Sequence, residues 1–193
     1  NDHKVFLRKE YLTTLFLEKN LLNYNFLMLA TEYQPESVSI ILQFIQNKQK
    51  IFNPYLEEIL FNKNQKGCNS LMLSRHHPIA MTPLIDFIHQ LPKGVLSLTL
   101  EKIFLEKNNF GLTFFMLLAK DKSHSLKLVL EFIEKHPDLF TQENLFKLIL
   151  EKSEQEYNSF MLAARNQYDA VDHILNFIQK NPEESVQEHQ YQV

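Results

Sequence analysis

The residues best suited to chemistry in this sequence are its single cysteine, Cys68, and the adjacent pair His76 and His77. A thiolate beside a histidine can act as a nucleophile, and cysteine with histidine can bind zinc. The zinc role does not fit, because zinc sites use spacings such as Cys-x2-Cys with His-x3-His, which are absent here. The nucleophilic role does not fit either, because the positions reached from Cys68 at successive intervals of 44 or 45 residues hold Tyr24, Leu112 and Tyr157, so we interpret Cys68 as a half-buried spacer. The sequence also lacks Gly-x-Ser-x-Gly, Walker and His-Glu-x-x-His motifs. We therefore predict a non-enzymatic chain with no catalytic residue, no cofactor and no metal site.

Charge and hydropathy argue against two further classes of function. Twenty basic residues face 23 acidic ones, so the net charge is −3, and lysine and glutamate alternate along the chain. A protein that tracks a nucleic-acid backbone needs a continuous basic stripe, so we expect no nucleic-acid partner. The longest apolar run covers residues 114–119, whereas a transmembrane helix needs about 20 residues, so we expect no membrane span.

An internal repeat predicts the elements that position these side chains. Four of the five methionines recur at spacings of 44, 44 and 45 residues. They are Met28, Met72, Met116 and Met161. Each lies in a similar block, at residues 25–30, 69–74, 113–118 and 158–163. Self-similarity at this period is typical of helical repeat proteins. We call these four segments the methionine helices.

Two further helices are predicted in each unit. The one after the methionine block has apolar residues at i, i+3, i+4 and i+7, which form one helix face. These Phe-Ile helices, named for a shared residue pair, cover residues 38–45, 81–88, 126–133 and 171–178. The helix before the methionine block ends near a lysine in every unit. These lysines are Lys19, Lys63, Lys107 and Lys152, and we call the segments the lysine helices.

Three lysine helices have a predicted start. The side chains of Asn53, Ser97 and Thr141 can accept hydrogen bonds from unpaired backbone N–H groups, as N-caps do. Pro54 suits the first helical position, where its missing N–H costs nothing.

The sequence thus predicts an all-α fold, specifically an α-solenoid of about four 44–45-residue repeats with three short helices each. Residues 1–181 would form one array, with units at about 5–48, 52–92, 96–137 and 140–181, and residues 182–193 a polar tail. One unit cannot bury its apolar faces, whereas stacked units can.

A single cysteine fits a reducing compartment. Because residue 1 is Asn, we expect an excised fragment.

The methionine block resembles the start of an ankyrin repeat, which has the pattern Gly-x-Thr-x-Leu-x-x-Ala-Ala. Residues 111–115 and 67–71 keep much of this pattern, and residues 158–164 keep the cap and the alanines without the glycine. The resemblance implies that the Phe-Ile helix is the outer helix of a pair and that inner helices and adjoining loops line a concave face. The ankyrin period is 33 residues, and the lysine helix takes the place of its β-hairpin. A HEAT-like array, with a period of about 40–47, is the alternative.

Positions shared by the four units are expected to be structural, and positions that vary are free to bind. The shared methionines are interpreted as core rather than an adaptable binding stripe. The shared lysines are interpreted as cations at helix C-termini rather than a phosphate ladder. The variable stretch follows each methionine helix and mixes aromatic, cationic and amide groups. It comprises Glu32, Tyr33, Gln34, His76, His77, Lys120, Asp121, Lys122, Arg165, Asn166, Gln167 and Tyr168.

We therefore expect a protein–protein interaction scaffold that binds a partner protein through these variable positions. The alternative is a targeting or regulatory arm of a larger enzyme whose catalytic domain lies outside this chain. The composition, rich in Asn, Lys, Phe and Ile, is similar to that of repeat proteins that intracellular bacteria secrete into host cells. That resemblance implies a host protein as partner and a cytoplasmic or host-cytosolic location. The sequence leaves the oligomeric state open and favours a monomer.

Overall fold

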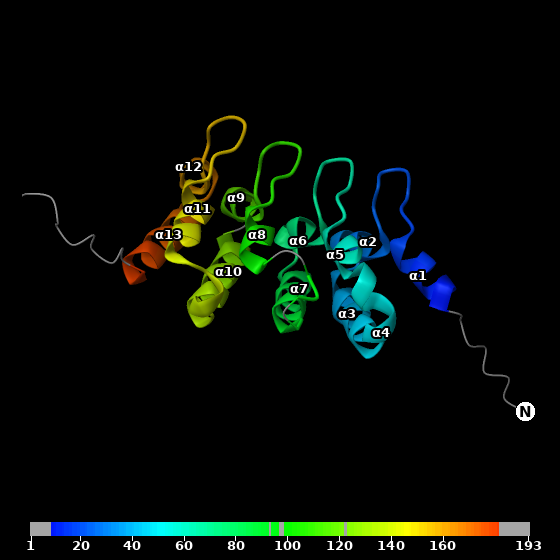
Figure 1. Ribbon diagram of the computed structural model, residues 1–193. Coiled ribbons are helices and arrows are strands. Elements are labelled where there is room, and N and C mark those ends of the chain that lie inside the picture. The colour runs from blue at the N-terminus through cyan, green and yellow to red at the C-terminus, as the bar shows by residue number, and fades with distance from the viewer. Residues whose placement is uncertain (1–8, 93, 97–98, 122, 182–193) are drawn as a thin grey trace, which may run out of the picture.

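The computed structural model describes residues 9–92, 94–96, 99–121 and 123–181, and it is all-α over that part of the chain. Figure 1 shows the helices side by side along one direction, with α1 and α13 at opposite ends and four loops projecting on the same side. The fold is therefore elongated, and segments about 44 residues apart in sequence are neighbours in space.

The three predicted kinds of helix are confirmed. The methionine helices are α2 (Phe26–Tyr33), α6 (Ser70–Leu73), α9 (Phe114–Asp121) and α12 (Ser159–Asn166). The Phe-Ile helices are α3 (Val38–Asn47), α7 (Pro78–Gln90), α10 (Ser123–Lys135) and α13 (Tyr168–Lys180). The lysine helices are α1 (Lys9–Leu17), α5 (Leu56–Phe61), α8 (Leu100–Leu105) and α11 (Gln142–Leu150). Connections contain α4 (Gln49–Phe52) and the 3-10 helices η1 (Pro35–Ser37), η2 (Asn53–Tyr55), η3 (Ser74–His76) and η4 (Pro137–Leu139).

The predicted starts of the lysine helices are partly wrong. Thr141 does cap α11, where its side chain accepts a backbone N–H. Asn53 caps nothing, because α4 runs directly into η2 and leaves Asn53 with helical φ and ψ of −49° and −42°, whereas an N-cap needs non-helical angles. Pro54 likewise lies in η2 rather than at the start of α5. Ser97 lies outside the described residues, and Thr99 caps α8.

Between each lysine helix and the next methionine helix lies an eight-residue loop, and these four loops are the projections in Figure 1. We call them fingers, and they comprise residues 18–25, 62–69, 106–113 and 151–158. Antiparallel bridges close the first finger, between Lys19 and Asn25, and the third, between Lys107 and Thr113. The expectation that a lysine helix replaces a hairpin is therefore wrong, because each unit holds both a lysine helix and a hairpin-like finger.

An asparagine folds three of the fingers. The side-chain oxygens of Asn20, Asn64 and Asn108 each accept two backbone N–H groups, from residues two and four positions on, at 2.9–3.0 Å. Such Asx turns offer the backbone an alternative to helix. In the fourth finger Ser153 accepts from one N–H only. The methionine helices then begin at a side-chain cap in each finger, namely Asn25, Asn69, Thr113 and Asn158.

The core follows the row of methionine helices, since α2 packs on α6, α6 on α9 and α9 on α12. Met28, Met72 and Met116 are completely buried, as predicted for a core column. The prediction is wrong for Met161, which is 48% exposed. Within the described chain no further methionine helix follows α12, so the side of Met161 that a next helix would cover stays open. Leu175 on α13 is exposed for the same reason.

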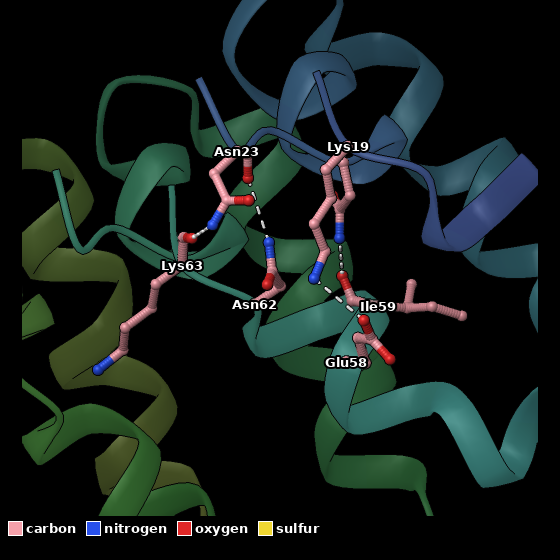
Figure 2. Close-up of polar contacts among 7 residues, drawn as sticks. Lys19, Asn23, Glu58, Ile59, Asn62 and Lys63 are labelled. Atoms are coloured by element: carbon pink, nitrogen blue, oxygen red, sulfur yellow. Dashed lines mark hydrogen bonds and ion pairs between the residues drawn. The ribbon is translucent and has the colours of Figure 1, made fainter. Parts of the chain in front are cut away.

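Successive fingers are joined edge to edge by hydrogen bonds. The backbone N–H groups of Gln65 and Asn109 donate to carbonyls of the preceding finger at 3.1 Å, and their side-chain amides donate to it at 2.9 and 3.0 Å. At the first joint, drawn in Figure 2, Asn23 donates to the carbonyl of Lys63 and Asn62 donates to the carbonyl of Asn23. These bonds hold neighbouring fingers at a fixed spacing.

The shared lysines belong to the same joints. Each lies two residues beyond the end of its helix, near the C-terminus as expected. Three of them also reach the next unit: Lys19 pairs with Glu58 at 3.0 Å (Figure 2), and the ammonium groups of Lys63 and Lys107 donate to the carbonyls of Lys107 and Lys152. Lys152 instead pairs with Glu156 of its own finger. The column therefore connects units through charge-assisted hydrogen bonds.

Candidate functional site

The described members of the predicted set lie at the C-terminal ends of the methionine helices and in the turns that follow them, except Tyr168, which is the first residue of α13. Tyr33 and Tyr168 are strongly exposed, at 64% and 87%. Lys122 lies outside the described residues. The helix ends are thus presented at the surface, but they occupy successive units and do not form one cluster.

A groove of about 520 Å³ runs between the fingers and the methionine helices, across the second, third and fourth fingers. Four of the predicted residues line it, and they are Lys120, Asp121, Arg165 and Asn166. The other described members of the predicted set do not line it; they are Glu32, Tyr33, Gln34, His76, His77, Gln167 and Tyr168. The structure therefore assembles part of the predicted surface and leaves the rest outside the groove.

Sequence reasoning missed the wall of the groove that the fingers supply. Lys66, Phe110 and Gln155 line it, one from each finger. They occupy the same finger position, two residues after Asn64, Asn108 and Ser153 respectively. The residue type at this groove-lining position differs from finger to finger. The position two residues earlier, in contrast, always has a side chain that accepts a hydrogen bond. Comparing the fingers as well as the helix ends would have found these residues.

The groove is positively charged. Of its described lining residues four are cationic, namely Lys66, Arg75, Lys120 and Arg165, and Asp121 is anionic. The Arg75 guanidinium donates to the Asp121 carboxylate of the next unit at 3.0 Å and to the Met72 carbonyl at 2.9 Å. Both side chains of this ion pair are mostly buried, at 21% and 24% exposure. The single acid is therefore neutralised, and the remaining cations dominate the field.

The other two cations of the helical wall differ in their contacts. The Arg165 guanidinium lies 5.5 Å from the centre of the Tyr157 ring, a cation–π contact between α12 and the fourth finger. Lys120 is exposed at the end of α9. Beside them, Leu117 and Leu162 are nearly buried and form an apolar floor. The wall thus combines fixed positive charge with apolar surface.

Cys68 lies in the groove wall. It is buried, and the Asn108 side-chain amide donates a weak hydrogen bond to its Sγ atom at 3.6 Å. Among the described residues, no three His, Cys, Asp or Glu side chains are placed to hold a metal ion. In the same part of the chain, no helix is long and apolar enough to cross a bilayer.

The first unit carries a different electrostatic environment. Burial, together with a hydrogen bond to Glu32 and the negative charge of that residue, raises the pKa of Tyr24 to about 12. Tyr24 takes the place of Cys68 one unit earlier, and Glu32 takes the place of Lys120 and Arg165. The helical wall therefore changes from negative in the first unit to positive in the third and fourth.

Comparison with known proteins adds no family. No protein-family model matches the chain, and no curated protein matches its sequence significantly.

Proposed function

We propose that this chain is a non-catalytic protein-interaction module, a four-unit α-solenoid of ankyrin-like type that binds a partner protein in the groove between its fingers and methionine helices. One observation carries the proposal. Equivalent positions of successive units line the groove with residues that differ in type, on a scaffold of shared asparagines, lysines and buried methionines. Variable side chains on a repeated scaffold are the way solenoids present a binding face.

The scaffold supports binding by preorganisation. The cross-finger hydrogen bonds and the Arg75–Asp121 pair hold both walls of the groove before a partner arrives. A surface that is already ordered loses little conformational entropy on association. We therefore propose that the groove binds with its backbone essentially unchanged.

The test is selection of peptides from a random-sequence display library with the full chain as bait. A groove variant with Lys66→Ala, Phe110→Ala and Arg165→Ala is compared with a control variant, Ile40→Ala with Lys50→Ala and Lys135→Ala. The control removes one exposed apolar side chain and two cations outside the groove. We expect peptides that bind the wild type and the control but not the groove variant, with circular dichroism unchanged. Peptides that bind all three alike would contradict the assignment.

A further inference from the structure

We propose that the occupant of the groove is an extended acidic segment of the partner protein, with a carboxylate at about every third residue and apolar residues between. This inference rests on the proposed function, since it takes the groove as the binding site and adds the chemistry and spacing of what fills it.

The charge of the groove favours an acidic occupant. The chain as a whole carries a net charge of −3, yet the described lining of the groove has four cations and one acid. Since Arg75 already neutralises Asp121, the groove attracts negative charge against the overall sign of the protein. Complementary potentials speed encounter and reject partners of like charge. An acidic occupant fits this surface better than a neutral or basic one.

The spacing of the cations along the groove sets the spacing of the carboxylates that would pair with them. Lys120 and Arg165 lie at the same place in successive units, four residues after Met116 and Met161 respectively. Their helices, α9 and α12, pack directly on each other. Packed helices lie about 8–10 Å apart, and an extended chain rises about 3.3 Å per residue. A segment that crosses the helices therefore advances about three residues per unit, so carboxylates three residues apart meet successive cations.

The groove also has apolar surface beside its cations. Phe110 on the finger wall is 59% exposed, and Leu117 and Leu162 lie below it in the groove. Aromatic side chains, phenylalanine included, and arginine are enriched at protein interfaces. The residues between the carboxylates are therefore expected to be apolar, with Phe110 as their main contact.

A nucleic acid is the competing anion, and the geometry favours a peptide. The Arg165 guanidinium lies over one face of the half-buried Tyr157 ring, which leaves Phe110 as the strongly exposed aromatic side chain of the described groove lining. In the first unit, Glu32 occupies the place of Lys120 and Arg165, so the positive stripe does not continue along the molecule. Proteins that track a nucleic-acid backbone need such a continuous stripe.

The experiment measures binding of fluorescein-labelled peptides to the full chain by fluorescence anisotropy. The probe has glutamate at every third position with leucine and serine between. The second peptide has the same composition with its glutamates contiguous, and the third has glutamine for glutamate. A fluorescein-labelled oligouridylate of equal charge is the fourth probe. We expect the spaced acidic peptide to bind about tenfold or more tightly than the other three, and its binding to weaken with salt.

Charge reversal locates the contact. Lys120→Glu with Arg165→Glu should weaken binding of the spaced peptide about tenfold or more, because each change removes an attraction and adds a repulsion. Lys48→Glu with Lys50→Glu changes the net charge equally on residues outside the groove lining and should leave binding unchanged. An equal effect of both pairs would overturn the proposal.

The remaining outcomes separate this inference from the proposed function. The proposal of an acidic segment with spaced carboxylates is overturned if the contiguous peptide or the glutamine peptide binds as tightly as the spaced acidic peptide. It is also overturned if the oligouridylate binds more tightly than that peptide. If display selection then yields neutral or basic peptides that need the groove, the interaction module stands and only this inference fails. If selection yields no groove-dependent peptide, the proposed function fails with it.

Discussion

At the residue scale, one position in the fingers decides how closely the units can stack. Asn23, Gly67, Gly111 and Glu156 occupy it, and all four have a positive φ, between 62° and 74°. Glycine adopts this conformation without the clash that a Cβ atom brings. At Gly67 and Gly111 a second constraint applies, because the next finger approaches the α-carbon directly.

We predict that Gly111→Ala destabilises the protein more than Gly94→Ala. A Cβ atom at Gly111 would lie 2.6 Å from the backbone nitrogen of Glu154, whereas one at Gly94 meets nothing within 4 Å, and both residues have positive φ. Gly94→Ala therefore costs only the left-handed strain of about 1–2 kcal/mol. Gly111→Ala adds an overpacking cost of about 1–3 kcal/mol. Urea denaturation measures both variants, and equal losses would contradict the close approach of the fingers.

Tyr24 predicts a pH dependence. Its folded pKa of about 12 exceeds the unfolded value of about 10, so folding favours the neutral phenol. The stabilisation is complete below pH 10 and is lost as pH rises from about 10 to 12. Between pH 9 and 11 the Tm of the wild type should therefore fall more than that of Tyr24→Phe, in which lysine deprotonation is the same. Parallel Tm curves for the two proteins would show that the phenol is not held neutral by the fold.

At the element scale, the joints between units explain why a lysine follows each lysine helix. A helix C-terminus alone favours a cation. The structure adds a second requirement, since the ammonium groups of Lys63 and Lys107 reach the backbone carbonyl of the equivalent lysine in the next unit. In the last finger, Lys152 pairs within the finger to Glu156. The same residue type thus joins neighbouring fingers at Lys63 and Lys107 and makes a contact within its own finger at Lys152.

We predict that Lys107→Met destabilises the protein by about 1 kcal/mol, because it leaves the Lys152 carbonyl without its charged donor and Glu151 without its partner. Methionine was chosen because it keeps an apolar side chain similar to the aliphatic part of lysine. The matched change Lys152→Met should have little effect, since it breaks only an exposed pair within one finger. Thermal denaturation of both variants compares them. A larger loss at Lys152 would show that the joints do not carry the stability.

At the scale of the whole molecule, stability is expected to be graded along the row of helices. Helix α9 packs between α6 and α12 and is almost entirely buried, whereas α1 and α13 lie at the two ends of the row of described helices. In an array held by nearest-neighbour contacts, end units open more readily than central ones.

We predict that backbone amides of α9 exchange with deuterium most slowly and those of α1 and α13 fastest. Native-state hydrogen exchange read by mass spectrometry measures the gradient. The Gly111→Ala variant should lower protection mainly in the third and fourth fingers and the helices they join. Uniform protection along the chain would mean that the units unfold as one cooperative body, against the nearest-neighbour description.

Much of the local structure could be predicted from the sequence. The methionine helices follow from the internal repeat and the Phe-Ile helices from apolar spacing, and the Thr141 cap follows from a local side-chain preference. The prediction failed at Asn53, where the preceding segment is already helical, and at Met161, where the sequence matches the buried copies but no later methionine helix among the described residues covers it. Both failures come from neighbours that the local pattern does not contain.

The sequence by itself determined the helices and the period, because helix formation and its apolar face depend on residues within a few turns of one another. Only the tertiary structure decided the site. Arg75 and Asp121, 46 residues apart, form an ion pair, and Lys66, Phe110, Lys120 and Arg165 line one groove, only because segments far apart in the sequence pack side by side. The charge of the groove therefore depends on contacts between units, which a periodic pattern does not specify.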